Sequence, residues 1–103
     1  MTELCDLTAV ELRRRIGTKE ISPVELLESC VARIEAVNPA VNALTAMDLD
    51  AARRTAKAAE TAVLKGEPLG VLHGLPTGVK DLSDTAGLRT TYGSPLFADH
   101  VPE

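Results

Sequence analysis

The stretch that decides the class of fold reads Leu72-His-Gly-Leu-Pro-Thr-Gly-Val-Lys-Asp-Leu-Ser-Asp-Thr-Ala-Gly-Leu-Arg-Thr-Thr-Tyr-Gly-Ser94. It shows no helical periodicity. Five of the seven glycines of the chain fall between residues 70 and 93. Because glycine reaches backbone conformations that other residues avoid, this composition predicts short strands joined by shaped loops.

Lys80 is the one cation in the apolar, glycine-containing first half of this stretch. If residues 75–80 are extended, side chains alternate between two faces, so that Gly78 leaves space beside Lys80 and Asp81 points away. Burial among apolar groups lowers the pKa of a lysine, and a neutral amine can act as a general base. The spacing by itself favours the other reading, in which the lysine ends a strand and extends its amine into solvent.

A phosphate-binding P-loop is excluded by the same residues. That motif has four residues between its glycines, followed by Gly-Lys and a Ser or Thr. Here three residues separate Gly74 from Gly78, Val79 intervenes before Lys80, and Asp81 follows. The lysine therefore does not belong to a nucleotide-binding loop.

Metal and redox sites are not expected either. His73 and His100 stand alone in the sequence, and we expect a structural hydrogen bond for the first and an exposed side chain for the second. Cys5 and Cys30 match no metal or redox spacing, so we expect two reduced thiols, with Cys30 in the core. These residues thus predict no metal site.

Upstream of the glycine-rich stretch, the first of three predicted helices begins at Thr8. Thr8 and Glu11 have the spacing of a capping box, and Gly17 is a suitable end. The apolar positions expected to face the core are Val10, Leu12 and Ile16.

The second predicted helix has the clearest start. Ser22 suits the N-cap, Pro23 the first helical position, and Glu25 completes a capping box. One apolar stripe follows, made of Val24, Leu27, Val31 and Ile34. We expect Asn38-Pro39 to end this helix, because proline restricts the residue before it and donates no hydrogen bond.

A short strand is predicted over residues 41–47, and a third helix follows it. Asp48 or Asp50 can cap this helix, which runs to Leu64 and ends at Gly66. Its small-residue stripe suits close packing and consists of Ala52, Ala56, Ala59 and Val63.

Composition excludes several classes of partner. The formal net charge of −4 and the pI of about 5.1 offer no attraction to nucleic acid or to an anionic membrane. The only basic cluster, Arg13–Arg15, fits a solvated helix face. No apolar run spans a bilayer and the start does not resemble a signal peptide, so we expect a cytoplasmic protein.

Residues 72–94 resemble the signature of amidase-signature enzymes, through Leu-His-Gly at 72–74, Val-Lys-Asp at 79–81 and Thr-Thr-Tyr-Gly-Ser at 90–94. The Ser22–Leu26 helix start and residues 34–42 are also similar to that family. The resemblance extends from about Leu7 onward. It implies an α/β fold in which residues 1–103 form the N-terminal segment of a single, incomplete domain: the opening helices and the first strands of a mixed sheet flanked by helices.

The resemblance also implies a function, one that uses no metal and no organic cofactor. In this family a lysine at the position of Lys80 is the general base of a Ser–cis-Ser–Lys triad that hydrolyses a small-molecule amide through an acyl-enzyme. The two serines belong to a Gly-Gly-Ser-Ser-Gly-Gly-type segment that this sequence lacks, and Ser83 and Ser94 do not replace them. We therefore expect residues 1–103 to be inactive alone, and to self-associate or to bind the missing remainder of the domain.

Two other functions stay open. One is the amidase subunit of a tRNA-dependent amidotransferase, although residues 88–94 look more like the general amidases. The other is a non-catalytic binding or structural module. A reading frame that continues past Glu103 into a Ser-Ser motif would favour an enzyme over such a module.

Overall fold

The computed structural model describes residues 2–103, which form two compact units. Residues 2–43 and 49–76 make up the helical unit, and residues 44–48 and 77–103 make up the loop unit. The boundary after Pro76 falls inside the glycine-rich stretch. The α-helices all lie before that stretch, as the sequence predicts.

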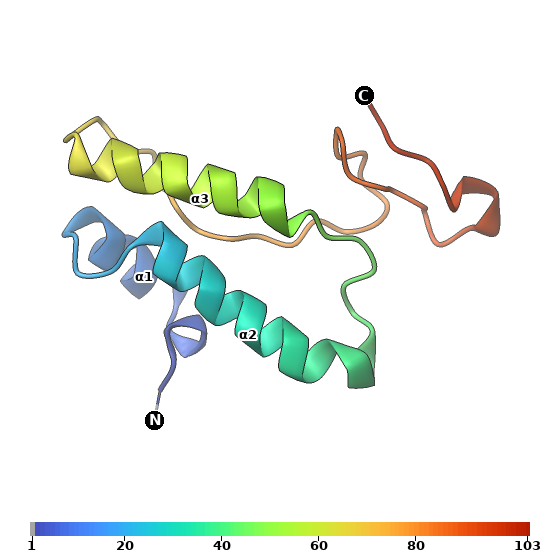
Figure 1. Cartoon of the computed structure of the whole chain (residues 1–103), viewed down its shortest axis with the longest axis horizontal. Coiled ribbons are helices and arrows are strands. Elements are labelled where there is room, and N and C mark those ends of the chain that lie inside the picture. The colour runs from blue at the N-terminus through green and yellow to red at the C-terminus, as the bar shows by residue number, and fades with distance from the viewer. Residues whose placement is uncertain (1) are drawn as a thin grey trace. The chain divides into compact units, whose positions relative to one another are not determined.

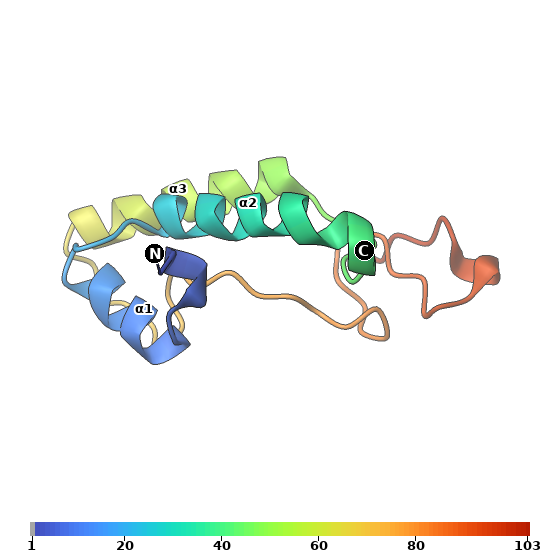
Figure 2. The same cartoon turned by 90° about the horizontal axis from the view of Figure 1, so that it is seen from below.

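The helical unit contains a 3-10 turn, η1 (Leu4–Asp6), and the helices α1 (Ala9–Gly17), α2 (Pro23–Val41) and α3 (Leu49–Leu64). α2 and α3 lie side by side and run in opposite directions (Figures 1 and 2). The buried cluster of this unit consists of Leu12, Ile16, Leu26 and Val63. Among residues 2–103, no helix is both long and apolar enough to cross a bilayer.

α1 confirms the predicted start at Thr8, whose hydroxyl accepts a hydrogen bond from the Glu11 amide at 3.2 Å. The Glu11 carboxylate accepts hydrogen bonds from Arg14 and Arg15, where the capping box predicted a bond back to the cap. Val10 was expected in the core but is 83% exposed. It precedes the buried Leu12 by two positions, which places it on the opposite side of a helix.

α2 begins as predicted. The Ser22 hydroxyl accepts from the Val24 amide at 3.0 Å, and the Glu25 carboxylate accepts from the Ser22 amide at 3.2 Å. Leu27 and Val31 of the predicted stripe are buried. The stripe missed Leu26, which is fully buried.

The predicted end of α2 at Asn38-Pro39 is wrong, because the helix continues to Val41. Pro39 lies in the last turn of α2. It has no amide hydrogen to donate to the carbonyl four residues earlier, but the helix has few residues after it, so the loss disrupts little. Asn42 then adopts a left-handed conformation (φ 49°) and donates its amide to the Asn38 carbonyl at 2.7 Å. Asparagine tolerates this conformation, so the helix ends there with a satisfied carbonyl.

α3 begins directly after Asp48, one of the two predicted caps, and ends at Leu64 as expected. Gly66 follows with φ 72°, which confirms it as the C-terminal glycine. The predicted small-residue stripe is half-buried to buried along the helix. Small side chains let α3 lie close beside α2.

Residues 2–103 form no β-strand, so the strand predicted over 41–47 and the short strands predicted for the glycine-rich stretch are not confirmed. Residue 41 is helical, and residues 42–48 and 75–80 lie outside helices and strands. An isolated bridge joins Thr85 and Leu88. A strand requires a neighbour with which to exchange hydrogen bonds, and neither segment has one in the described part of the chain. The predicted mixed sheet is therefore not formed by these residues.

The segment from Leu69 to Leu75 closes the helical unit. Leu69 and Leu75 pack against the buried cluster, and the Gly70 carbonyl accepts a hydrogen bond from Arg13 Nε at 3.0 Å. His73 Nε2 lies 2.9 Å from the Ala59 carbonyl, which confirms the predicted structural histidine. These contacts thus hold residues 69–75 against α1 and α3.

Candidate active site

Lys80 lies in the loop unit, at the start of a turn in which the Ser83 amide donates to the Lys80 carbonyl at 3.0 Å. Its side chain is exposed, and no carboxylate of residues 2–103 pairs with it. A Cβ added at Gly78 would meet no heavy atom within 4 Å, so the space predicted beside the lysine is present. The spacing of Lys80 favours an amine that extends into solvent, and in residues 2–103 its side chain is exposed.

Asp81 is held by the residues around position 91. Its carboxylate accepts a hydrogen bond from the Thr91 amide at 2.8 Å and another from the Thr91 hydroxyl, while its carbonyl accepts from the Tyr92 amide at 2.9 Å. The bonds from the Thr91 side chain and backbone lower the pKa of Asp81 below its usual value. Among residues 2–103 Asp81 forms no ion pair with Lys80, because its carboxylate is bound to Thr91 and not because of the strand on which the prediction depended.

Thr90 is the buried centre of the loop unit, with 2% of its surface exposed. Its amide donates to the His100 carbonyl at 2.9 Å and its hydroxyl donates to the Leu88 carbonyl at 3.1 Å. Sequence reasoning did not single out this residue. The Thr-Thr doublet of the signature was the available signal: one threonine organises the loop and the next binds Asp81.

Arg89 joins the two segments of the loop unit and was also missed. Its guanidinium donates to the Thr45 carbonyl at 2.6 Å and to the Ala98 carbonyl at 3.3 Å. These partners lie 44 and 9 positions away in the sequence. No local pattern could have predicted the longer contact.

His100 is half-buried, so the expectation that it is exposed is wrong. Its ring packs against Tyr92 and Phe97, each with ring centroids 5.8 Å away. The Tyr92 hydroxyl donates to the Asp84 carboxylate, which raises the pKa of the tyrosine. Few aromatic rings are present in this chain, and the loop unit collects them in one small cluster.

Ser83 and Ser94, which we do not expect to replace the family's serines, have roles in turns. The Ser94 hydroxyl accepts from the Leu96 amide at 3.3 Å and caps a second 3-10 turn, η2 (Pro95–Phe97). Ser83 contributes its amide to the turn that begins at Lys80.

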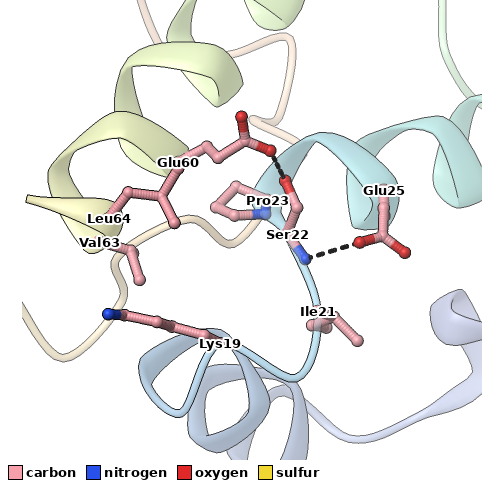
Figure 3. Close-up of a pocket in the computed structure, with 8 residues that line it drawn as sticks. All are labelled: Lys19, Ile21, Ser22, Pro23, Glu25, Glu60, Val63 and Leu64. Atoms are coloured by element: carbon pink, nitrogen blue, oxygen red, sulfur yellow. Dashed lines mark hydrogen bonds between the residues drawn. The ribbon is translucent and has the colours of Figure 1, made fainter.

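The helical unit carries a shallow pocket lined by Lys19, Ile21, Ser22, Pro23, Glu25, Glu60, Val63 and Leu64 (Figure 3). The Ser22 hydroxyl caps α2 and donates to the Glu60 carboxylate, which also binds Lys57 at 2.7 Å. The hydrogen bonds from Lys57 and from Ser22 lower the pKa of Glu60. This hydroxyl is thus committed to joining α2 and α3, and no residue of the signature lines the pocket.

Both cysteines are free and half-buried. Cys30 packs against the buried cluster, as predicted, and burial raises the pKa of its thiol. A raised pKa keeps the thiol protonated and weakly nucleophilic. Cys30 is therefore a core residue of the helical unit.

Comparison with known proteins identifies the class. The model of the amidase family matches residues 25–103. An acylamidase of Rhodococcus erythropolis is 37% identical over 95 residues, which are 92% of this chain and 20% of that protein. A glutamyl-tRNA(Gln) amidotransferase subunit of Sinorhizobium medicae is 44% identical over 102 residues, 99% of this chain and 20% of the relative.

The crystal structure of a bacterial aryl acylamidase of the amidase-signature family superposes with a TM-score of 0.88 at 35% identity, and covers 93% of this chain. The chain belongs to the amidase-signature family. It spans about a fifth of the length of these relatives.

Proposed function

We propose that this chain contributes the lysine base to an enzyme that hydrolyses the C–N bond of a small-molecule amide. The observation that carries the proposal is the Val-Lys-Asp segment at 79–81. There Lys80 projects from the surface of the loop unit beside Gly78, while the neighbouring Asp81 is bound to Thr91. A lysine without a carboxylate partner is free to exchange a proton with a neighbouring hydroxyl.

In this proposal Lys80 acts within a Ser–cis-Ser–Lys triad. A neutral lysine amine takes the proton of the bridging serine, which in turn takes the proton of the nucleophilic serine. The nucleophile attacks the amide carbonyl carbon, the C–N bond breaks, and the ammonia or amine leaves with the proton that Lys80 returns through the bridging serine. Water then hydrolyses the acyl-enzyme and releases the carboxylate.

Neither serine of such a triad is present in residues 1–103. We propose that these residues form the opening part of one amidase-signature domain, whose mixed sheet and serines come from a further segment. Apolar side chains at the surface of the loop unit support this, because Val79 is 54%, Leu82 61% and Leu96 90% exposed. Large apolar side chains that are exposed in one part of a domain are often covered by the rest of it.

A chimera tests the proposal. This chain replaces the aligned segment of the Rhodococcus erythropolis acylamidase, and hydrolysis of a panel of aryl and alkyl amides is measured. We expect hydrolysis by the chimera and none by purified residues 1–103. Turnover by residues 1–103 alone that Lys80→Ala abolishes would contradict the proposed need for the serines.

A second candidate function is that of the amidase subunit of an amidotransferase, which the 44% identity to the Sinorhizobium medicae relative favours. Such a protein would pass released ammonia to a partner. The discriminating experiment is a second chimera built on that relative, with ammonia release from glutamine as the readout. Ammonia release by this chimera, without amide hydrolysis by the acylamidase chimera, would favour the amidotransferase.

A further inference from the structure

The backbone of Lys80 is fixed more firmly than its side chain. The lysine amine has no partner among residues 2–103, so no side-chain contact determines where it points. Its carbonyl accepts the Ser83 amide, and the next residue, Asp81, binds residues 91 and 92. The direction in which Lys80 projects therefore depends on the turn over residues 80–83.

Asp81 fastens that turn to the centre of the loop unit. Its carboxylate accepts both donors of Thr91, and its carbonyl accepts the Tyr92 amide at 2.9 Å. Thr91 follows the buried Thr90, whose amide is bound to the His100 carbonyl. Three hydrogen bonds of Asp81 thus join the turn to Thr91 and Tyr92, the two residues that follow the best-buried residue of the loop unit.

We infer that Asp81 is a positioning residue for Lys80: by binding Thr91 and Tyr92 it holds the turn from which the lysine reaches the reacting serines. This inference rests on the proposed function of Lys80. Asp81 does not act on the substrate. A group held within hydrogen-bonding reach of its partner transfers a proton far more effectively than one displaced by about 1 Å.

Hydrogen exchange of the 103-residue chain gives the first test, independent of activity. The Tyr92 amide binds the Asp81 carbonyl, which Asp81→Ala leaves in place. If the carboxylate holds the turn, Asp81→Ala accelerates exchange of the Tyr92 amide by about tenfold or more, and the control Asp99→Ala leaves it unchanged. Equal exchange in wild type and Asp81→Ala overturns the inference.

Activity of the acylamidase chimera gives the second test. We expect Asp81→Ala to lower kcat by about tenfold or more with less than about a threefold change in KM. Asp81→Asn keeps an oxygen that accepts the Thr91 amide, and we expect it to restore kcat to within about fivefold. A purely structural role would instead change kcat and KM together, with no rescue by asparagine.

The two proposals fail in different ways. Full activity of Lys80→Ala in the chimera overturns the proposed function. Loss of activity in Lys80→Ala, together with unchanged kcat in Asp81→Ala, overturns only the role of Asp81. Unaltered kcat in Thr91→Val, which removes the hydroxyl donor, also counts against that role, whereas Thr91→Ser is expected to act like wild type.

Discussion

Individual residues of the signature have distinct roles, and several of them stabilise the fold. His73 holds the closing segment to α3, Gly74 lets it pass close to α1 and α2, and Thr90 is the centre of the loop unit. Lys80 is a charged residue of the signature whose side chain forms no ion pair among residues 2–103. That contrast supports the proposal that Lys80 takes part in the reaction.

Gly74 gives a stability prediction at this scale. It has φ +80°, and a Cβ there would lie 2.9 Å from Pro23 Cγ and 3.2 Å from Ile16 Cδ1. We expect Gly74→Ala to lower the free energy of unfolding by about 1–3 kcal/mol, because the new methyl group is both strained and crowded. Urea unfolding of the 103-residue chain measures this.

The matched control is Gly70→Ala in the same segment, where a Cβ meets nothing within 4 Å. We expect it to change the free energy of unfolding by less than about 0.5 kcal/mol. Equal effects of the two substitutions would show that close packing at Gly74 is not important.

At the scale of residues, prediction from sequence was correct where the hydrogen-bond partners lie close together in the sequence. Ser22 and Thr8 were identified as caps because a cap binds the backbone two or three residues ahead. Arg89 was missed because its partner at Thr45 is distant in sequence. The exposure of Val10 was missed because the apolar residues of a short helix were all assigned to one face.

At the scale of elements, the start of α2 joins two helices. The Ser22 hydroxyl caps α2 and also donates to Glu60 of α3. We expect Ser22→Ala to lower the free energy of unfolding by about 1–2 kcal/mol, since it removes both bonds. Thermal unfolding followed by circular dichroism measures this, with the exposed Ser83→Ala as the control expected to be near neutral.

The ion pairs of Glu11 in helix α1 predict that the free energy of unfolding depends on pH. Hydrogen bonds from Arg14 and Arg15 lower the pKa of Glu11 from 4.5 to about 2. A carboxyl whose pKa is lower in the folded state stabilises that state fully above pH 4.5, and the stabilisation is lost as the pH falls toward 2. We therefore expect Glu11→Gln to be less stable than wild type at pH 6 and equal to it near pH 2.

Urea unfolding at the two pH values tests this, with Glu67→Gln as a control because no ion pair of the Glu67 side chain occurs in residues 2–103. A difference between Glu11→Gln and wild type that persists unchanged at pH 2 would contradict the assignment.

The boundaries of the helices were predicted correctly where a capping residue or a glycine marks them. The starts of α1 and α2 and the end of α3 were predicted from such residues. The end of α2 was not, because Pro39 in a last turn disrupts little and Asn42 forms the left-handed cap in its place. In α2 the left-handed Asn42, and not Pro39, ends the helix.

At the scale of the whole molecule, family membership was predictable and the sheet was not. The signature and the helix starts together indicated the amidase-signature family, which the comparisons confirm. The strands were not confirmed, because strand pairing depends on segments brought together from elsewhere in a fold. The same dependence applies to the active site, where one residue of a proposed triad lies in this chain.

The proposed reaction is tested most directly by amide hydrolysis in the acylamidase chimera with Lys80 replaced. We expect Lys80→Ala to lower kcat/KM by about 10³-fold or more, and Lys80→Arg to do the same because a guanidinium does not give up its proton. The matched control Lys65→Ala, at the end of α3, is expected to keep wild-type activity. Wild-type activity in Lys80→Ala would contradict the assignment of Lys80 as the general base.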